Sequence, residues 1–167
     1  TQSRSSAASD VYKRQLEDTE EELNTLIKNQ LSLSNTAGLE YEYSNLGFAM
    51  LGYIIHKVSG MTYDTYIAKN ILAPLSMQGT SFEYTDIPKN VFANGYRYIN
   101  DQWRKEQPLK NGIYGAMGGM ITSIDMFSKY VALHEDAWPA RDNAENFPIK
   151  RSSLREMHQP AFFIGLN

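Results

Sequence analysis

The sequence predicts an α+β fold that is mostly helical, with short strands and no large sheet built from this chain alone. Helical periodicity with capping signals recurs in four stretches, at residues 18–31, 46–59, 63–71 and 123–134. Between the last two, residues 78–103 mix turn formers with aromatic and β-branched residues, which is typical of short strands joined by loops. With 167 residues, the chain is long enough for one domain with a core.

The first predicted helix, residues 18–31, begins with a capping box formed by Thr19 and Glu22. Acidic residues fill its first turn, where the helix dipole favours negative charge. Four apolar residues recur at helical spacing on one face: Leu23, Leu26, Ile27 and Leu31. This pattern predicts an amphipathic helix that packs by one side.

The second predicted helix, residues 46–59, is apolar nearly all round, and Gly60 follows it as a C-cap. Such a helix is expected to be buried against other elements. The third, residues 63–71, is expected to be capped by Thr62 and to end before Pro74.

The fourth predicted helix, residues 123–134, is capped by Ser123. The side chains expected to point inward from it are Ile124, Phe127, Tyr130 and Val131. A last short helix is expected to open at Ser152 or Ser153 and to stop at Pro160.

Composition excludes several classes of function. The formal net charge of −3 gives no basic surface for nucleic acid, so no nucleic-acid partner is expected. The longest uncharged apolar stretch, residues 44–55, is far shorter than the roughly 20 residues of a membrane span. The chain has no cysteine, and His56, His134 and His158 share no ligand spacing, so neither a metal nor another cofactor is expected.

The opening residues 1–15, "TQSRSSAASDVYKRQ", lack the apolar region of a signal peptide. Residues 5–15 look like the in-frame translation of a sequencing-library adaptor. We therefore expect residues 1–15 to be a non-native segment that makes no native contacts, and residues 16–167 to be a partial domain. On this interpretation the native reading frame begins upstream of Leu16.

A tyrosine and an asparagine stand directly before the apolar helix, in the stretch "EYEYSNLGF". In an extended segment residues i and i+2 project to the same side, so Tyr43 and Asn45 can face one site. A phenol near a cation can act as a general base, and a side-chain amide can both donate to and accept from a substrate. The pairing suits acyl transfer, but Tyr-x-Asn also occurs at Tyr98-Ile99-Asn100, so the tripeptide alone decides nothing.

The context of the first copy is more specific. Tyr43-Ser44-Asn45 is followed by "LGFAMLGYIIHKVSGMTYDTYIAKNILAPLSMQGTSF" and later by "GAMGGMITSIDMFSKYV". This order resembles the serine β-lactamase-related family, in the branch of class C β-lactamases, D-alanyl-D-alanine carboxypeptidases and related esterases. The resemblance covers residues 39 to about 131 and implies part of a β-lactamase/transpeptidase-like fold: the helical domain with short strands, the central sheet largely missing. Ser76 stands where the family often has glycine.

The resemblance also implies a chemistry. In the family, the serine of Ser-x-x-Lys attacks the carbonyl of a β-lactam, a peptidoglycan D-Ala peptide or an ester, and an acyl-enzyme forms and is hydrolysed. Tyr43 corresponds to the catalytic residue that moves a proton, and Asn45 to the residue that binds and orients the substrate. Such enzymes are periplasmic or extracellular by family habit, and the substrate is a small molecule or a peptidoglycan peptide.

Two family motifs are absent from the 167 residues, and their absence leads to further expectations. The sequence contains neither Ser-x-x-Lys nor the third motif; Lys110-Asn111-Gly112 imitates the latter but is expected to be a loop. This chain by itself is therefore expected to be inactive. Without the central sheet, the apolar faces of residues 46–59 and 123–134 are expected to be partly exposed.

Two other functions stay open at this point. Some relatives of such enzymes keep the fold and lose the chemistry, so the chain could belong to a non-catalytic binding module. An all-helical interaction protein unrelated to hydrolases is the other alternative. It would leave the "GAMGG" stretch and the "APLSM" turn unexplained.

Overall fold

The computed structural model describes residues 19–29, 31, 35–36, 38–39, 41–108, 110–145 and 148–160. The interpretation of residues 1–15 as non-native lies outside these residues. The elements, in chain order, are α2 (Glu20–Asn29), α3 (Asn45–Ser59), α4 (Tyr63–Ile67), the π-helix η1 (Ala68–Leu72), the 3₁₀-helix η2 (Tyr84–Asp86), β1 (Tyr96–Ile99), β2 (Gln102–Lys105), the 3₁₀-helix η3 (Gly112–Met117), α5 (Ile124–Glu135) and α6 (Arg151–Met157).

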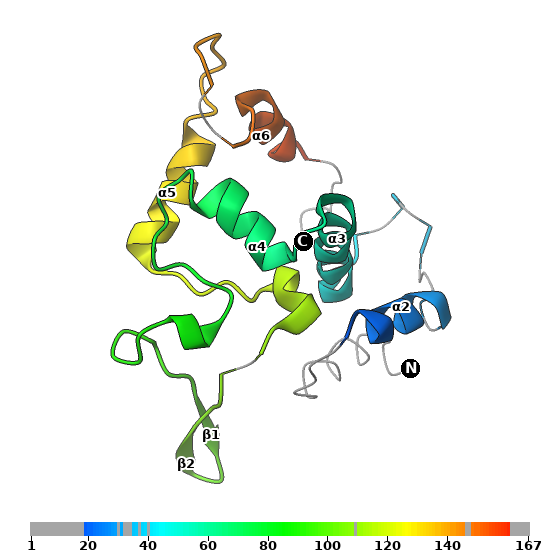
Figure 1. Cartoon of the computed structure of the whole chain (residues 1–167), viewed down its shortest axis with the longest axis vertical. Helices are drawn as coiled ribbons and strands as arrows, with labels where there is room; N and C mark the ends of the chain where they lie inside the picture. Colours follow the sequence, from blue (N-terminus) through cyan, green and yellow to red (C-terminus); the bar gives the residue numbers. More distant parts are fainter. Residues whose placement is uncertain are drawn as a thin grey trace.

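The described part of the chain is mainly helical, and the predicted fold class is confirmed. Its one sheet is the antiparallel hairpin of β1 and β2, in which Tyr98 is paired with Trp103. Every residue of the two strands is exposed, and the hairpin projects away from the helices (Figure 1). The four predicted helical stretches are all present, with α4 continuing into the π-helix η1.

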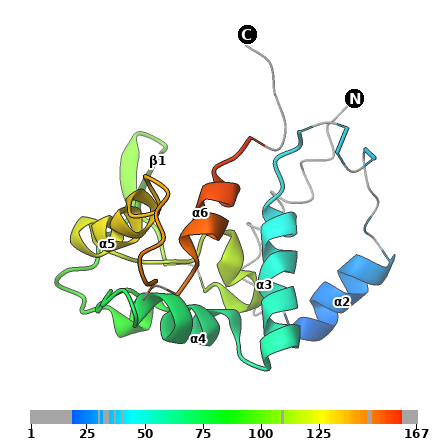
Figure 2. The same cartoon turned by 90° about the horizontal axis from the view of Figure 1, so that it is seen from above.

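Helix α2 begins as predicted. The Glu22 carboxylate accepts a hydrogen bond from the Thr19 backbone N–H at 2.8 Å, and the Thr19 hydroxyl accepts one from the Glu22 N–H at 3.3 Å. This is the reciprocal pairing of a capping box. Leu23 is fully buried, and Tyr53 of α3 donates a hydrogen bond to Asn24 at 2.9 Å. Helix α2 therefore lies beside α3, on the side away from α4 and α5 (Figure 2).

Helix α3 is held at both ends by local signals. The Ser44 hydroxyl accepts a hydrogen bond from the Gly47 N–H, and Gly60 takes the left-handed conformation at φ 70°. Between these caps, Ala49 and Gly52 are buried. A Cβ placed on Gly52 would lie 2.5 Å from the Cβ of Ala116, so only glycine allows η3 to approach this closely.

The opposite face of α3 is open, which confirms the expected partial exposure. Four large apolar side chains on it are more than half exposed: Phe48, Leu51, Ile54 and Val58. The expectation of a helix buried all round therefore does not hold for the described part of the chain. Small residues make the packed side of α3, and large ones face solvent.

The core consists of two clusters of buried side chains. One contains Leu72, Met77 and Phe82 and packs against side chains of α4 and α5. The other contains Leu133, Ala137 and Leu154 and joins α5 to α6. Figure 1 shows α4 between α3 and α5, so these clusters connect the helices across the molecule.

Three details of the predicted helices are wrong. The hydroxyl of Thr62 makes no capping bond to the backbone; it donates to the Thr65 hydroxyl at 2.8 Å. Neither Ser152 nor Ser153 opens the last helix, because Lys150 occupies the N-cap position and both serines lie inside α6. On α5, which Ser123 does cap, three of the four residues expected to point inward are exposed: Ile124, Phe127 and Val131. The first two errors concern how a helix begins, and only the third depends on what lies opposite the helix.

Within the described residues, no helix combines the length and the apolar composition needed to cross a membrane.

Candidate active site

The two side chains of the predicted site lie together at the start of α3. The Tyr43 hydroxyl donates a hydrogen bond to Oδ1 of Asn45 at 2.9 Å. Tyr43 is the last but one residue before α3 and Asn45 the first residue of the helix. This contact agrees with the prediction that Tyr43 and Asn45, two residues apart, face the same side.

Ser44 lies between them and faces another way. Its backbone is extended, with φ −139° and ψ 106°, and its hydroxyl accepts a hydrogen bond from the Gly47 N–H at 3.0 Å. Its carbonyl accepts the first helical hydrogen bond, from Phe48, at 3.4 Å. The sequence therefore uses one residue to start the helix and its two neighbours to present polar groups beyond the helix end.

The second Tyr-x-Asn has a different geometry. Tyr98 and Ile99 belong to β1, while Asn100 begins the hairpin turn with φ 51°. The Tyr98 ring lies 5.2 Å from that of Trp103, and its hydroxyl approaches Asp101 rather than Asn100, at 3.5 Å. This copy does not pair a phenol with the amide two residues later.

The Tyr43–Asn45 pair is open to solvent. Tyr43 is 72% exposed, and Asn45 is partly buried. Within the described residues, no lysine or arginine side chain hydrogen-bonds either member of the pair. The phenol and the amide can together donate to and accept from a polar group placed against them.

Lys110-Asn111-Gly112 was predicted to be a loop, and the structure places it outside the strands. Asn111 precedes η3, and its side-chain amide donates to the carbonyls of Phe82 at 2.7 Å and Gly119 at 3.1 Å. Asn111 therefore ties the glycine-rich stretch to the core, and this tripeptide is structural.

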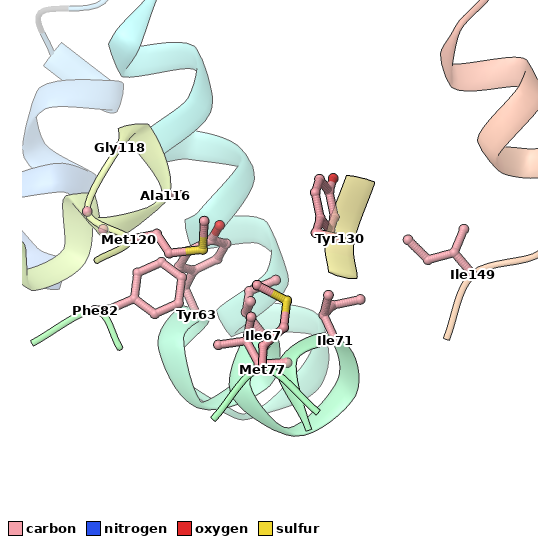
Figure 3. Close-up of a pocket in the computed structure, with 13 residues that line it drawn as sticks. Tyr63, Ile67, Ile71, Met77, Phe82, Ala116, Gly118, Met120, Tyr130 and Ile149 are labelled. Atoms are coloured by element: carbon pink, nitrogen blue, oxygen red, sulfur yellow. The ribbon is translucent and has the colours of Figure 1, made fainter. Parts of the chain in front are cut away.

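An apolar cavity of about 330 Å³ lies beside the buried cluster of Leu72, Met77 and Phe82, and neither Tyr43 nor Asn45 lines it. Figure 3 shows Phe82, Tyr63 and Met120 at one side of it and Tyr130 and Ile149 at the other. Burial raises the pKa of the Tyr63 phenol, and the neighbouring Tyr130 raises it further. Tyr63 is therefore neutral near pH 7, and the cavity offers apolar contact rather than acid–base chemistry.

The described residues contain no group of three or more histidine, aspartate or glutamate side chains arranged to hold a metal ion. His134 and His158 are the nearest approach to a cluster, with Nδ1 of the first 2.9 Å from Nε2 of the second.

Sequence reasoning missed one buried charge. Arg151 is 5% exposed, and its guanidinium donates to Asp136 at 2.8 Å and to the Asn143 carbonyl at 3.0 Å. The two contacts hold the loop between α5 and α6 against α6. An arginine at the start of a short helix carries no signal of burial, because the partners come from a loop up to 15 residues earlier.

Known proteins share sequence patterns with this chain. A family model described as beta-lactamase matches residues 5–161. The chain is 41% identical over 64 residues to protein flp of Staphylococcus aureus, a match that covers 38% of this chain and 13% of that protein. It is 43% identical over 53 residues to beta-lactamase-like protein 2 of Dictyostelium discoideum, covering 32% of this chain and 10% of that protein.

The fold has a solved counterpart. The octameric penicillin-binding protein homologue from Pyrococcus abyssi superposes with a TM-score of 0.64 at 23% identity, over 83% of this chain and 34% of that one. The chain thus spans about a third of that structure and little more than a tenth of the curated relatives it matches. Since the family model covers nearly all of its residues, the chain belongs to the beta-lactamase family, whose members have a serine-hydrolase-type, penicillin-binding-protein-like fold.

Proposed function

We propose that Tyr43 and Asn45 belong to the active site of a serine hydrolase that works through an acyl-enzyme. The observation that supports this most directly is the 2.9 Å hydrogen bond between the two side chains at the exposed start of α3. The substrate is a β-lactam, a peptidoglycan D-Ala peptide or an ester. Family membership supports a small-molecule or peptide substrate, and the choice among these three classes belongs to the proposal.

In the proposed reaction, the hydroxyl oxygen of a serine attacks the substrate carbonyl and its proton passes to the lysine–tyrosine pair. The bond to the leaving amine or alcohol then breaks as that group takes up a proton, and water later hydrolyses the ester bond to the serine. Tyr43 moves the proton, and Asn45 orients the substrate. The serine and lysine come from a Ser-x-x-Lys segment, which these 167 residues do not contain.

The test compares the 167-residue chain alone with the chain joined to any coding sequence that flanks it. Both are assayed on a chromogenic β-lactam and a short-chain ester. We expect no turnover by the chain alone and turnover by the extended protein, reduced roughly 10²- to 10⁴-fold by Tyr43→Phe. Tyr98→Phe is the matched control, because it alters the other Tyr-x-Asn and is expected to leave the rate unchanged.

The second candidate is a non-catalytic binding module with the same fold. The retention of both Tyr43 and Asn45 argues against it. Flanking sequence without Ser-x-x-Lys, together with ligand binding but no turnover, would support the module. Turnover by the chain alone would contradict the assignment of the nucleophile to another segment.

A further inference from the structure

Little besides the backbone holds the Tyr43–Asn45 pair in place. Tyr43 is 72% exposed, so few side chains contact its ring. Within the described residues, the hydrogen bond to Asn45 is the one its hydroxyl makes. A side chain with so few contacts takes its direction from its own backbone and from that of the next residues. The geometry of the pair therefore depends on the torsion angles of Ser44.

Those angles are fixed by the Ser44 cap. The hydroxyl accepts from the Gly47 N–H at 3.0 Å while the backbone stays extended at φ −139° and ψ 106°. In this arrangement Asn45 is helical while Tyr43 still lies in the approach segment. Without the side-chain acceptor, the first N–H groups of α3 lose a partner and the first turn frays. Fraying at Ser44 would turn Tyr43 relative to Asn45.

We infer that Ser44 is a positioning residue, which sets the Tyr43 hydroxyl against the Asn45 amide through its cap on α3. The inference rests on the proposed function, since it assigns Ser44 to the same reaction. The Ser44 hydroxyl is turned to the helix, where it accepts from the Gly47 N–H. Its effect should therefore pass through the Tyr43–Asn45 pair and not through a contact of its own with the substrate.

The chain offers a matched control in Ser123. This serine caps α5 in the same way, with its hydroxyl accepting from the Met126 N–H at 3.3 Å and its backbone extended. Nothing in the proposed reaction involves α5. Ser123→Ala removes an equivalent cap elsewhere, so it reports what the loss of a cap does to the fold alone.

The test measures kcat, KM and Tm of the extended protein with Ser44→Ala, Ser44→Thr and Ser123→Ala. We expect Ser44→Ala to lower kcat roughly 10- to 100-fold, since small misplacements of reacting groups have effects of this size. Ser44→Thr retains a hydroxyl and should restore most of the rate. Ser123→Ala should lower Tm about as much as Ser44→Ala and leave kcat unchanged. A normal kcat in Ser44→Ala, or an equal loss in Ser123→Ala, would overturn the inference.

A second measurement separates this inference from the proposed function. The proton–proton NOE between the Tyr43 ring and the Asn45 side-chain amide is measured in the 167-residue chain, which requires no turnover. Ser44→Ala should weaken this NOE and Ser44→Thr should restore it, whereas Ser123→Ala should leave it in place. An unchanged NOE in Ser44→Ala would overturn the positioning role even if the enzyme proves active, and an NOE lost in Ser44→Ala but kept in Ser44→Thr supports it even if no activity is found.

Discussion

The α5–α6 pair and helix α3 achieve packing in opposite ways. Between α5 and α6 two leucines are buried beside Ala137, with Leu133 2% exposed and Leu154 fully buried. On α3 the buried residues are Ala49 and Gly52, and the large apolar side chains face solvent. Hydrophobic composition alone therefore does not indicate which residues stabilise a helix. Leucines fill the α5–α6 contact, while at α3 glycine lets two backbones come close.

The largest expected effect contrasts two leucines. Leu133→Ala should lower the free energy of unfolding by about 2–5 kcal/mol, since it leaves a cavity in a packed cluster. Leu51→Ala removes the same atoms from a side chain that is 55% exposed, and should change stability by only about 0.5 kcal/mol. Urea unfolding of the 167-residue chain, followed by circular dichroism, measures both. Equal losses would mean that the open face of α3 is covered in solution.

On α3, adding a side chain to a buried glycine should destabilise the fold, whereas between α5 and α6 it is the removal of a side chain that does so. Gly52→Ala places a Cβ 2.5 Å from the Cβ of Ala116. Overpacking of this kind costs about 1–3 kcal/mol, and the better helix propensity of alanine offsets up to about 1 kcal/mol of it. We expect a net loss of stability in urea unfolding. Adding Ala116→Gly should recover most of that loss, and a double-mutant cycle without coupling would show that α3 and η3 do not meet here.

The sequence predicted the parts of the fold that depend on near neighbours. The Thr19–Glu22 capping box, the Ser123 cap and the left-handed Gly60 each involve residues within four positions of one another, so local pattern sufficed. The contact between Tyr43 and Asn45 followed from the alternation of an extended segment.

Burial was predicted poorly because it depends on distant segments. The close approach of Gly52 to Ala116 joins residues 64 positions apart, and nothing near Gly52 in the sequence indicates it. Arg151 is buried because Asp136 and the Asn143 carbonyl receive it. For the candidate site, the sequence indicated that Tyr43 and Asn45 meet. It did not indicate that the side chain of Ser44, the residue between them, caps α3.

A smaller effect is expected at the turn that joins η1 to the core. Ser76 has φ 54°, in the left-handed region that favours glycine, and its carbonyl accepts a hydrogen bond from Lys129. Because this bond uses only the backbone of Ser76, Ser76→Gly should keep it and raise stability by about 0.5–1 kcal/mol. Asn100→Gly is the control: Asn100 also has positive φ, but asparagine tolerates it, so the gain there should be smaller. Equal gains would show that strain at Ser76 contributes nothing.

The smallest effect concerns pH and tests the α5–α6 side of the comparison. Burial lowers the pKa of His134 below its ordinary value of 6.5, and the neighbouring His158 lowers it further. Nε2 of His134 is buried without a hydrogen-bond partner in the described structure, so a proton there would be poorly solvated. Between the folded and unfolded pKa values the unfolded chain binds more protons, so stability is full above pH 6.5 and declines as the pH falls through the folded pKa. Asp136, whose pKa the Arg151 guanidinium lowers from 3.8, loses its contribution only at more acidic pH.

Urea unfolding at several pH values between 5 and 7.5 should therefore show that stability declines as the pH falls. His134→Phe keeps a ring against Tyr130 and should remove this decline. A decline that survives in His134→Phe would assign the pH dependence to another group and leave the α5–α6 contact insensitive to protonation.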